Sequence, residues 1–380
     1  MKRSVIIMLA VVVLTTTAGC AGVLRGGATG GNDGEVAESS AATEDKASES
    51  VTFPNGTGEN GLDADELTSR QTTVLEDGSY VVETREASKL ETGTYEESIV
   101  LSVDGDRKIQ KTKFEYEPAT EDSLLGPSGS ETWLFTESAN ETLVRRIVDS
   151  NERYRVENGP VAPRTDERHL RDELEAVLRV SEYELTDVEE ADGSTVVTYE
   201  GTEVSDELDQ LYPLIDEYHE VAVTVSVSDD GIERYAYEFE ATTVDGYPET
   251  IAVETTFSSV GETELGRPEW VHEGFERAPA ASISTDGEKM IALTLESGDP
   301  IPENARVSVS PISGYYVASL DEALEPGETL YLTVRDGQLL ASVDVKPDAG
   351  DAIDTEWFTV SATTEGGITA YEGTYEEPSG

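Results

Sequence analysis

The longest regular pattern in the chain is an alternation of apolar and polar residues that starts near residue 79 and recurs up to about residue 258. Successive side chains of a β-strand point to opposite faces, so a period of two predicts strands with one buried face. Gly93 and the turn Asp104-Gly105-Asp106 separate the first strands, which favours hairpins. The pattern therefore predicts an antiparallel meander. Its strands are expected at 80–85, 94–103, 107–117, 131–136, 142–148, 152–156, 183–188, 195–200, 220–228, 232–243 and 250–258.

Three segments instead follow the 3.6-residue period of an amphipathic helix. The first covers 63–76, with Asp63 as N-cap, Glu66 completing a capping box and Gly78 as the stop. The second follows a cap at Thr165, and the third runs from Ser205 to about Ile215. The apolar faces of these last two consist of Leu170, Leu174, Val177 and Leu178 in one and Leu208, Leu211, Tyr212 and Ile215 in the other.

A second unit is predicted over residues 279–371, where short strands alternate with turns such as Pro326-Gly327 and Asp336-Gly337. Short strands at regular spacing, without a helical stretch, favour a small all-β sandwich. Residues 372–380 are expected to form an acidic tail. The strands of this unit are expected at 288–295, 306–311, 315–318, 329–334, 338–345 and 356–362.

The N-terminus follows a different pattern. Lys2 and Arg3 precede an uninterrupted apolar run from Val5 to Leu14, and small residues lead to Cys20, the only cysteine. Spanning a membrane takes roughly twenty apolar residues, so this shorter run predicts a signal peptide. We expect residues 1–19 to be removed, Cys20 to carry a lipid, and the protein to be anchored at the extracellular face of the cell membrane.

Residues 20–61 show neither period and few large apolar residues, so they are expected to form a disordered tether. About forty flexible residues have an r.m.s. span of roughly 35 Å, which would hold the folded part clear of the lipid headgroups. Asn55 in this tether and Asn140 in a predicted turn begin candidate N-glycosylation sequons.

The charge of the chain restricts its environment. With 80 acidic and 26 basic residues the formal net charge is −54, which destabilises a compact state in dilute buffer. In molar salt the screening length falls to about 3 Å, so this composition is typical of a haloarchaeal protein. The alternative is an acidic disordered chain, but 37% apolar residues and 16 Tyr can build cores. The same charge excludes nucleic acid and anionic membrane surfaces as electrostatic partners.

Element order and a few short phrases resemble a known superfamily. These phrases are Val-Ser-Val-Ser-Asp-Asp-Gly-Ile at 225–232, Thr-Phe-Ser-Ser-Val-Gly at 256–261, and Pro268-Glu269-Trp270. Residues 62–271 resemble the LolA, LolB and LppX-like lipoprotein-carrier superfamily. The resemblance implies an α+β fold in which a few helices cover a curved antiparallel sheet, or half-barrel. It also implies that the apolar space between sheet and helices accepts acyl chains.

Catalytic patterns are missing from the sequence. His169, His219 and His272 belong to no paired-ligand spacing, and neither a phosphate-binding glycine loop nor a nucleophile elbow occurs. Acidic pairs are too frequent to be informative, and the sequence leaves open whether loops such as that of Asp104 and Asp106 bind Ca²⁺ or Mg²⁺. We therefore expect no enzyme activity, no cofactor and no dedicated metal site.

Two functions follow as hypotheses. In the first, the protein binds or carries a lipid or other apolar ligand at the outer face of the membrane. In the second, the half-barrel is filled, and the protein is a structural or interaction lipoprotein of the cell envelope whose β-sandwich binds another surface protein. The candidate ligand-lining residues of the first hypothesis are Trp133, Phe135, Leu174, Val177, Leu178, Tyr199, Leu208, Leu211 and Ile215.

Overall fold

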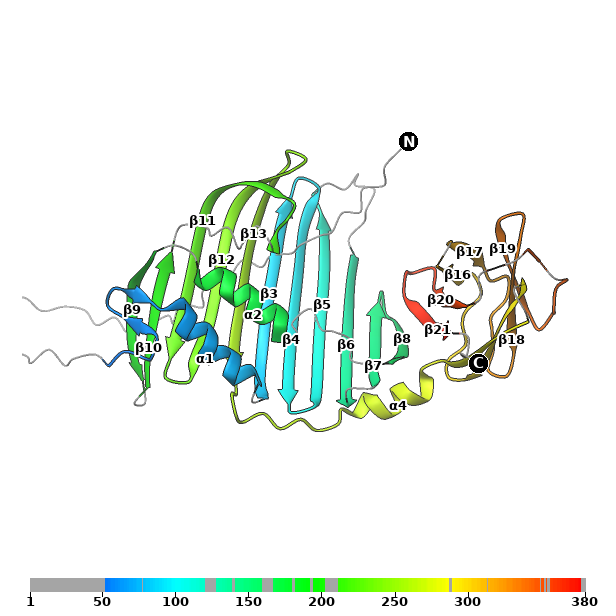
Figure 1. Cartoon of the computed structure of the whole chain (residues 1–380), viewed down its shortest axis with the longest axis horizontal. Coiled ribbons are helices and arrows are strands. Elements are labelled where there is room, and N and C mark those ends of the chain that lie inside the picture. Colours follow the sequence, from blue (N-terminus) through cyan, green and yellow to red (C-terminus); the bar gives the residue numbers. More distant parts are fainter. Residues whose placement is uncertain are drawn as a thin grey trace, which may run out of the picture.

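A large curved sheet followed by two smaller sheets makes up the chain (Figure 1). The first has eleven strands, and the other two have four each. All strand pairs are antiparallel, and the large sheet does not close into a barrel. The computed structural model describes residues 52–76, 78–119, 128–138, 141–158, 167–179, 182–191, 194–201, 211–286, 289–312, 314–348, 350–351, 353 and 356–376.

The eleven-stranded sheet consists of two meanders joined side by side. Strands β3 to β8 form one and β9 to β13 the other, and β3 pairs with β13 between them. The edges of the sheet are therefore β8 and β9. The strands are β3 Ser79–Leu90, β4 Gly93–Asp104, β5 Arg107–Pro118, β6 Ser128–Ser138, β7 Glu141–Val148, β8 Asn151–Asn158, β9 Tyr183–Ala191, β10 Ser194–Gly201, β11 Ile215–Ser228, β12 Gly231–Thr243 and β13 Pro248–Ser258.

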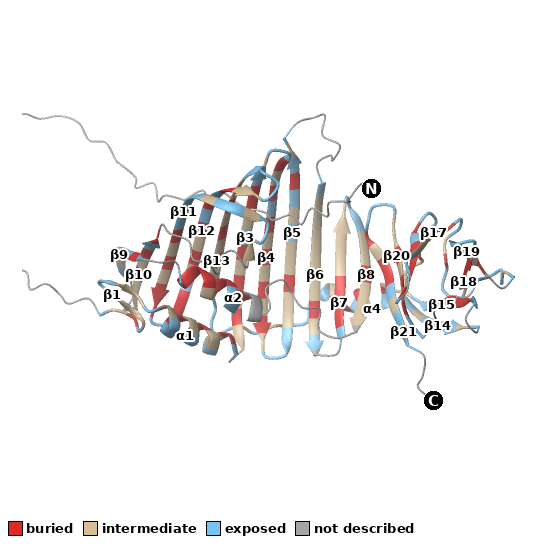
Figure 2. Ribbon diagram, turned by 45° about the horizontal axis from the view of Figure 1, so that its top comes forward, coloured by how far each residue is buried: buried red, intermediate tan, exposed pale blue. Residues whose placement is uncertain are grey.

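Alternating burial along these strands confirms the predicted period of two (Figure 2). In β4 every second residue is buried, among them Leu101 and Val103. Residues that pair directly across an antiparallel sheet point to the same face, so the register assigns every side chain to one face or the other. The fold class predicted from the sequence, a curved antiparallel sheet with a few helices, is confirmed.

One face of the sheet is covered by α1 (Ala64–Glu76) and α2 (Glu167–Leu178), and we call it the α1–α2 face. The predicted N-cap of α1 is confirmed, because Asp63 Oδ1 accepts a hydrogen bond from Glu66 N at 3.0 Å. The predicted apolar side of α2 is also confirmed. Leu170 and Val177 are fully buried in one core together with Val82 and Leu101 of the sheet.

The opposite face carries a third helix, α4 (Glu269–Arg277), which sequence periodicity did not predict. We call it the α4 face. Its core contains Phe135 of β6, Leu143 of β7, Tyr154 of β8 and Val271 of the helix. Contact is close, because a Cβ atom on Gly274 would lie 2.7 Å from Leu143 Cδ2. His272, expected in a connector, lies on this helix.

The segment between β13 and α4 runs along one end of the sheet, past β3, β4 and β5 (Figure 1). Backbone groups anchor it there: Gly261 N donates to Ser79 O at 2.7 Å, and Leu265 N donates to Asp104 Oδ2 at 3.1 Å. This path brings α4 to the far edge, where it packs on β7 and β8.

The C-terminal unit consists of two four-stranded sheets that share one core. Val309, Leu332 and Phe358 are buried in it, from strands of both sheets. The strand orders are β14-β15-β18-β19 and β17-β16-β20-β21. The strands are β14 Ala280–Thr285, β15 Ile291–Ser297, β16 Arg306–Pro311, β17 Tyr316–Ser319, β18 Thr329–Arg335, β19 Gln338–Val343, β20 Trp357–Thr363 and β21 Thr369–Glu376.

Three predicted boundaries are wrong. The ordered part begins before residue 62, since β1 (Thr57–Gly58) pairs with β2 (Gly61–Leu62) and Phe53 packs against the core. The Tyr199 hydroxyl holds this short hairpin by donating to Gly58 O at 2.9 Å. Strand β21 continues to Glu376, five residues into the expected tail, because its pairing with β20 extends that far.

The third error is the end of the helix predicted at 205–215, because Leu211 is helical but the helix does not reach Ile215. Residues 205–210 lie outside the described residues, and Ile215 is already the first residue of β11, paired with Thr243. The predicted sequon at Asn140 and the signal peptide with Cys20 also lie outside the described residues. Within the described ranges, no helix is long and apolar enough to cross a membrane.

Candidate ligand-binding face

The residues expected to line a ligand space do not form one set. Leu174, Val177, Leu178 and Tyr199 are at most 2% exposed and belong to the core beneath α1 and α2. The remaining candidates divide as follows: Leu211 and Ile215 pack at the margin of that core, Trp133 and Phe135 lie on the α4 face, and Leu208 lies outside the described residues.

The prediction that Trp133 and Phe135 line the same space as the residues of α2 is wrong, and the reason lies in the direction of their side chains. Both are odd-numbered residues of β6, and Phe135 pairs with Leu143, which contacts α4. The even-numbered Leu134 faces the α1–α2 side. Trp133 instead approaches Trp270 of α4, with ring centroids 6.4 Å apart. Alternation correctly divided the strand into two faces but could not tell which face each helix covers.

Beneath α2 the interior is filled, and part of the filling is polar. Glu173 of α2 is only 6% exposed, and it accepts a hydrogen bond from the Tyr237 hydroxyl at 2.9 Å. The Tyr212 and Tyr237 hydroxyls lie 2.8 Å apart. Burial, and next the charge of Glu173, raise the pKa of Tyr237 well above its ordinary value. These tyrosines therefore stay neutral and serve as hydrogen-bonding parts of the core.

Two of the surface cavities in the part of the chain that the structure describes have volumes of about 370 and 280 Å³. The first is lined largely by Glu96, Glu115 and Glu117 on the α4 face. The second lies at the turn between β11 and β12, beside the buried Gln71. No residue of α2 lines either cavity. Neither cavity is therefore a space between α2 and the sheet.

Beyond the end of α2, the α1–α2 face continues across β5 to β8 (Figure 1). Two rows of directly paired side chains cross it from the core to the edge. Both rows begin with a buried aliphatic residue on β4 and end with arginine on β8. The rows are Leu101, Gln110, Leu134, Val144 and Arg155, and Ile99, Thr112, Thr132, Arg146 and Arg153. With strands about 4.8 Å apart, each row spans roughly 19 Å.

The three arginines differ in their contacts. Arg155 pairs with Glu157, whereas Arg153 Nη1 donates to Pro300 O at 3.4 Å and lies 3.9 Å from Asp299 Oδ2. Arg146 has no ion pair with any residue in the described ranges, and its Nε is buried without a hydrogen-bond partner. Burial, and next the charge of Arg155, lower the pKa of Arg146 from its ordinary value.

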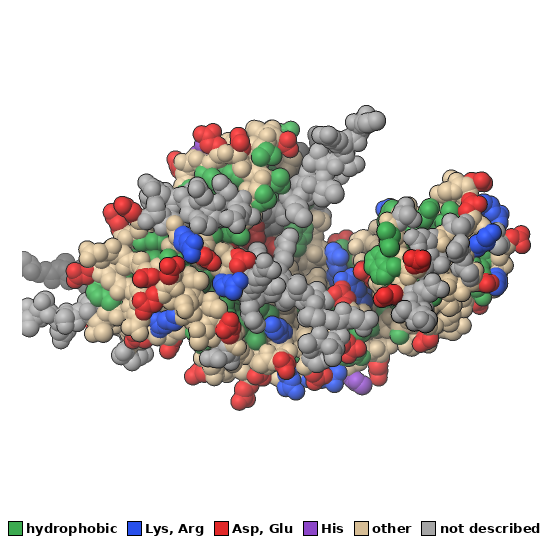
Figure 3. All heavy atoms as spheres, in the orientation of Figure 1, with side chains coloured by type: hydrophobic (Ala, Val, Ile, Leu, Met, Phe, Trp, Pro, Cys, Tyr) green, Lys and Arg blue, Asp and Glu red, His purple; other side chains and the backbone are tan. Residues whose placement is uncertain are grey.

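Arg153 lies at the junction with the C-terminal unit, because it contacts Pro300 and Asp299 of that unit. Figure 3 shows Lys and Arg side chains gathered in the hollow between the eleven-stranded sheet and the C-terminal unit. Elsewhere on this view acidic side chains are the more frequent charged type, as expected for a chain of net charge −54. The face thus combines an apolar and small-polar floor with a local positive end.

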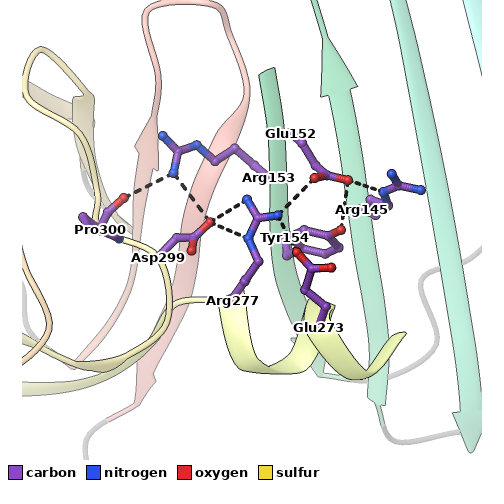
Figure 4. Close-up of polar contacts among 8 residues, drawn as sticks. All are labelled: Arg145, Glu152, Arg153, Tyr154, Glu273, Arg277, Asp299 and Pro300. Atoms are coloured by element: carbon purple, nitrogen blue, oxygen red, sulfur yellow. Dashed lines mark hydrogen bonds and ion pairs between the residues drawn. The ribbon is translucent and has the colours of Figure 1, made fainter. Parts of the chain in front are cut away.

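The junction between the two units lies at the edge strand β8 (Figure 4). Arg277, at the end of α4, donates to Asp299 Oδ2 through Nε and Nη2 at 3.1 and 3.0 Å, and to Glu152 Oε2 at 3.0 Å. Its guanidinium also lies 4.8 Å from the centroid of the Tyr154 ring. One side chain therefore connects α4, the large sheet and the loop after β15.

Acidification is expected to weaken this junction. Burial by itself would raise the pKa of Glu152, but hydrogen bonds from Arg145, Tyr154 and Arg277 outweigh it, so the pKa lies below 4.5. A carboxylate with a lowered folded-state pKa stabilises the fold above the unfolded value and loses that contribution as pH falls through the folded one. Thermal unfolding from pH 7 to pH 3 should therefore show a loss of stability below about pH 4.5. The same loss in Glu152→Gln would contradict this assignment.

The side chains of two of the three histidines are described, and each lies close to one polar neighbour. His219 Nε2 lies 2.7 Å from Thr242 Oγ1, and His272 lies on the exposed side of α4, 3.5 Å from Glu276. The side chain of His169 is outside the described residues. No group of three His, Cys, Asp or Glu side chains that could hold a metal ion occurs among those that the structure describes.

Comparison with known proteins places the chain in a family. A family of unknown function, DUF7537, matches residues 5–274. The chain belongs to this family. Among solved structures, the Mycobacterium tuberculosis lipoprotein LppX is similar over 52% of this chain and 97% of its own, with 12% identity and a TM-score of 0.27. No curated protein matches.

Sequence reasoning missed the three arginines, although a signal for them exists. The turn between β7 and β8 contains two residues, Asp149 and Ser150, both with positive φ, as in a type I′ hairpin. A two-residue turn sets the register of the whole hairpin. It therefore places Arg146 opposite Arg153 without any knowledge of the rest of the fold.

Proposed function

We propose that the protein is a lipid-anchored, non-enzymatic binding protein of the cell envelope, with its ligand site on the α1–α2 face of β4 to β8. The ligand is an amphiphilic lipid. The observation that carries the proposal is the pair of rows that run from buried aliphatic side chains at Ile99 and Leu101 to arginines at the edge. A surface that changes from apolar to cationic over roughly 19 Å matches a molecule with an apolar and a polar end.

This site differs from the one implied by a half-barrel carrier. Leu174 and Leu178 fill the space beneath α2, so acyl chains would lie beyond that helix, against the partly buried Leu134. Burial of apolar surface contributes about 25 cal/mol per Å². Salts that are excluded from protein surfaces strengthen this contribution, which suits a protein with a haloarchaeal composition.

A second function is favoured by the same packed interior. Ile312, Tyr315 and Trp357 of the C-terminal unit are 74%, 61% and 41% exposed. Ile312 follows Pro311, which pairs with Phe358, so Ile312 and Trp357 are neighbours at one end of a sheet. Exposed apolar residues that cluster in this way are typical of protein-binding surfaces. In this alternative the protein is an envelope scaffold that binds a surface protein.

Native mass spectrometry of the mature chain, purified from its own membranes in detergent, tests the first function. We expect one lipid per protein that dissociates on collisional activation, while a lipid attached covalently to Cys20 remains. Leu134→Gln should lose the dissociable lipid, because a buried amide without partners disfavours acyl contact. Leu340→Gln, on an exposed strand of the C-terminal unit, is the matched control and should retain it. A lipid-free wild-type protein would favour the scaffold.

Anchoring through Cys20 has its own test. Cys20→Ser removes the thiol to which the lipid would be attached, and we expect the protein to move from the membrane fraction to the medium. The described residues contain no membrane-spanning helix that could retain it. Fractionation of cells that express each form provides the measurement, with Ser39→Ala in the same segment as the control. Continued tight membrane association of Cys20→Ser would falsify lipid attachment at this residue.

A further inference from the structure

We propose that Arg146, Arg153 and Arg155 bind the headgroup of the lipid, and that this headgroup is an anionic phosphate ester. The inference rests on the proposed function, because it specifies the polar end of the ligand on the same face. It commits to a lipid with a phosphate ester and not to a free anion.

The register of the β7–β8 hairpin brings the three arginines to one face. Arg146 and Arg153 are directly paired, and Arg155 points to the same face two residues along β8. Directly opposed side chains have Cβ atoms about 4.5–5.5 Å apart, and like charges in that position are destabilising. The arrangement therefore needs a counter-charge above the sheet.

The residues that the structure describes supply only part of that counter-charge. Glu157 pairs with Arg155, and Asp299 lies 3.9 Å from Arg153 but makes its closer contacts, at 3.0 and 3.1 Å, with Arg277. Arg146 has no carboxylate partner in the described ranges.

Two of the guanidinium groups have a buried donor that lacks an acceptor. The Nε atoms of Arg146 and Arg155 are both buried without a hydrogen-bond partner. A buried donor without a partner costs free energy, and the cost is recovered when a ligand accepts from it. Planar guanidinium groups present paired N–H donors whose spacing matches the oxygens of a phosphate. Three of them on one face can contact all the free oxygens of a phosphate ester.

The salt concentration determines how far the negative charge of the chain repels an anionic headgroup. A chain of charge −54 repels anionic surfaces over the screening length, which is about 10 Å at 0.1 M salt. In molar salt that length falls to about 3 Å, so the long-range repulsion disappears while hydrogen-bonded contacts remain. A local arginine site can therefore select an anionic headgroup although the whole protein is strongly acidic.

The test compares two lipids with identical acyl chains, phosphatidylglycerol and diacylglycerol, presented to the full chain in detergent micelles at molar salt. Bound lipid is quantified by extraction after gel filtration. We expect wild type to prefer phosphatidylglycerol, and Arg146→Gln to lower that preference roughly tenfold or more, as expected for loss of a charged hydrogen bond. Arg146→Lys should retain part of the preference.

Arg145→Gln is the matched control, because Arg145 is the adjacent residue of β7 on the opposite face, paired with Glu152. It should keep the wild-type preference. Arg155→Gln is a second variant of the site, and thermal unfolding confirms that each protein is folded. Equal binding of both lipids by wild type would overturn the headgroup assignment and leave lipid binding intact. Binding of neither lipid would overturn the proposed function itself. Displacement of the lipid by millimolar inorganic phosphate would assign the arginines to a free anion.

Discussion

Replacing Leu174 by alanine is expected to lower the free energy of unfolding by about 2–5 kcal/mol. Leu174 is 1% exposed and packs in the core that joins α2 to the large sheet. Removing three carbon atoms at such a position leaves a cavity, because close-packed neighbours such as Leu170 relax only partly. Denaturant unfolding of the full chain, monitored in the salt in which it is purified, measures the change.

The result separates two roles of α2. If the helix were a movable lid over an empty ligand space, Leu174 would already border a void, and its truncation would cost well under 1 kcal/mol. Leu214→Ala is the matched control, since Leu214 is 48% exposed in the same unit and its truncation should change stability by no more than about 0.5 kcal/mol. A similar loss in both variants would contradict the packed interior.

Arg277→Ala is expected to uncouple the C-terminal unit from the large sheet, at a cost of about 1–2 kcal/mol at the junction. Arg277 is 30% exposed and contacts three carboxylates, those of Asp299, Glu152 and Glu273. An exposed ion pair is worth less than this, but removing the arginine leaves two half-buried carboxylates close together. In calorimetry we expect one unfolding transition in wild type and two in the variant.

Two further variants serve as controls for Arg277→Ala. Arg277→Lys keeps the charge but cannot donate from two nitrogen atoms to Asp299, so it should lie between wild type and Arg277→Ala. Arg306→Ala removes an exposed arginine of β16 within the C-terminal unit and should leave a single transition. If Arg277→Ala also unfolds in one transition at the wild-type temperature, the polar network does not hold the two units together.

Several features could be predicted because they depend on residues close in sequence. The strands follow from alternation, which needs only that one face of each strand is buried. The cap of α1 follows from Asp63 and Glu66, and the apolar side of α2 follows from the spacing of Leu170, Leu174 and Val177. Even the pairing of Arg146 with Arg153 is determined by a two-residue turn.

Other features depend on contacts between distant segments. Helix α4 is only nine residues long, which gives the helical period few turns in which to repeat. Its position depends on β7 and β8, more than a hundred residues earlier in the chain. The pairing of β3 with β13 joins the two meanders into one sheet, and no local pattern specifies that edge.

By itself, the sequence determined the fold class, most of the strands, two helices and the separation of each strand into two faces, because these follow from periods of a few residues. Only the tertiary structure decided which face each helix covers. It thereby moved Trp133 and Phe135 away from the α1–α2 core and left Arg146, Arg153 and Arg155 at the end of that face. The physical reason is that alternation is symmetric between the two faces, and packing against a distant segment breaks that symmetry.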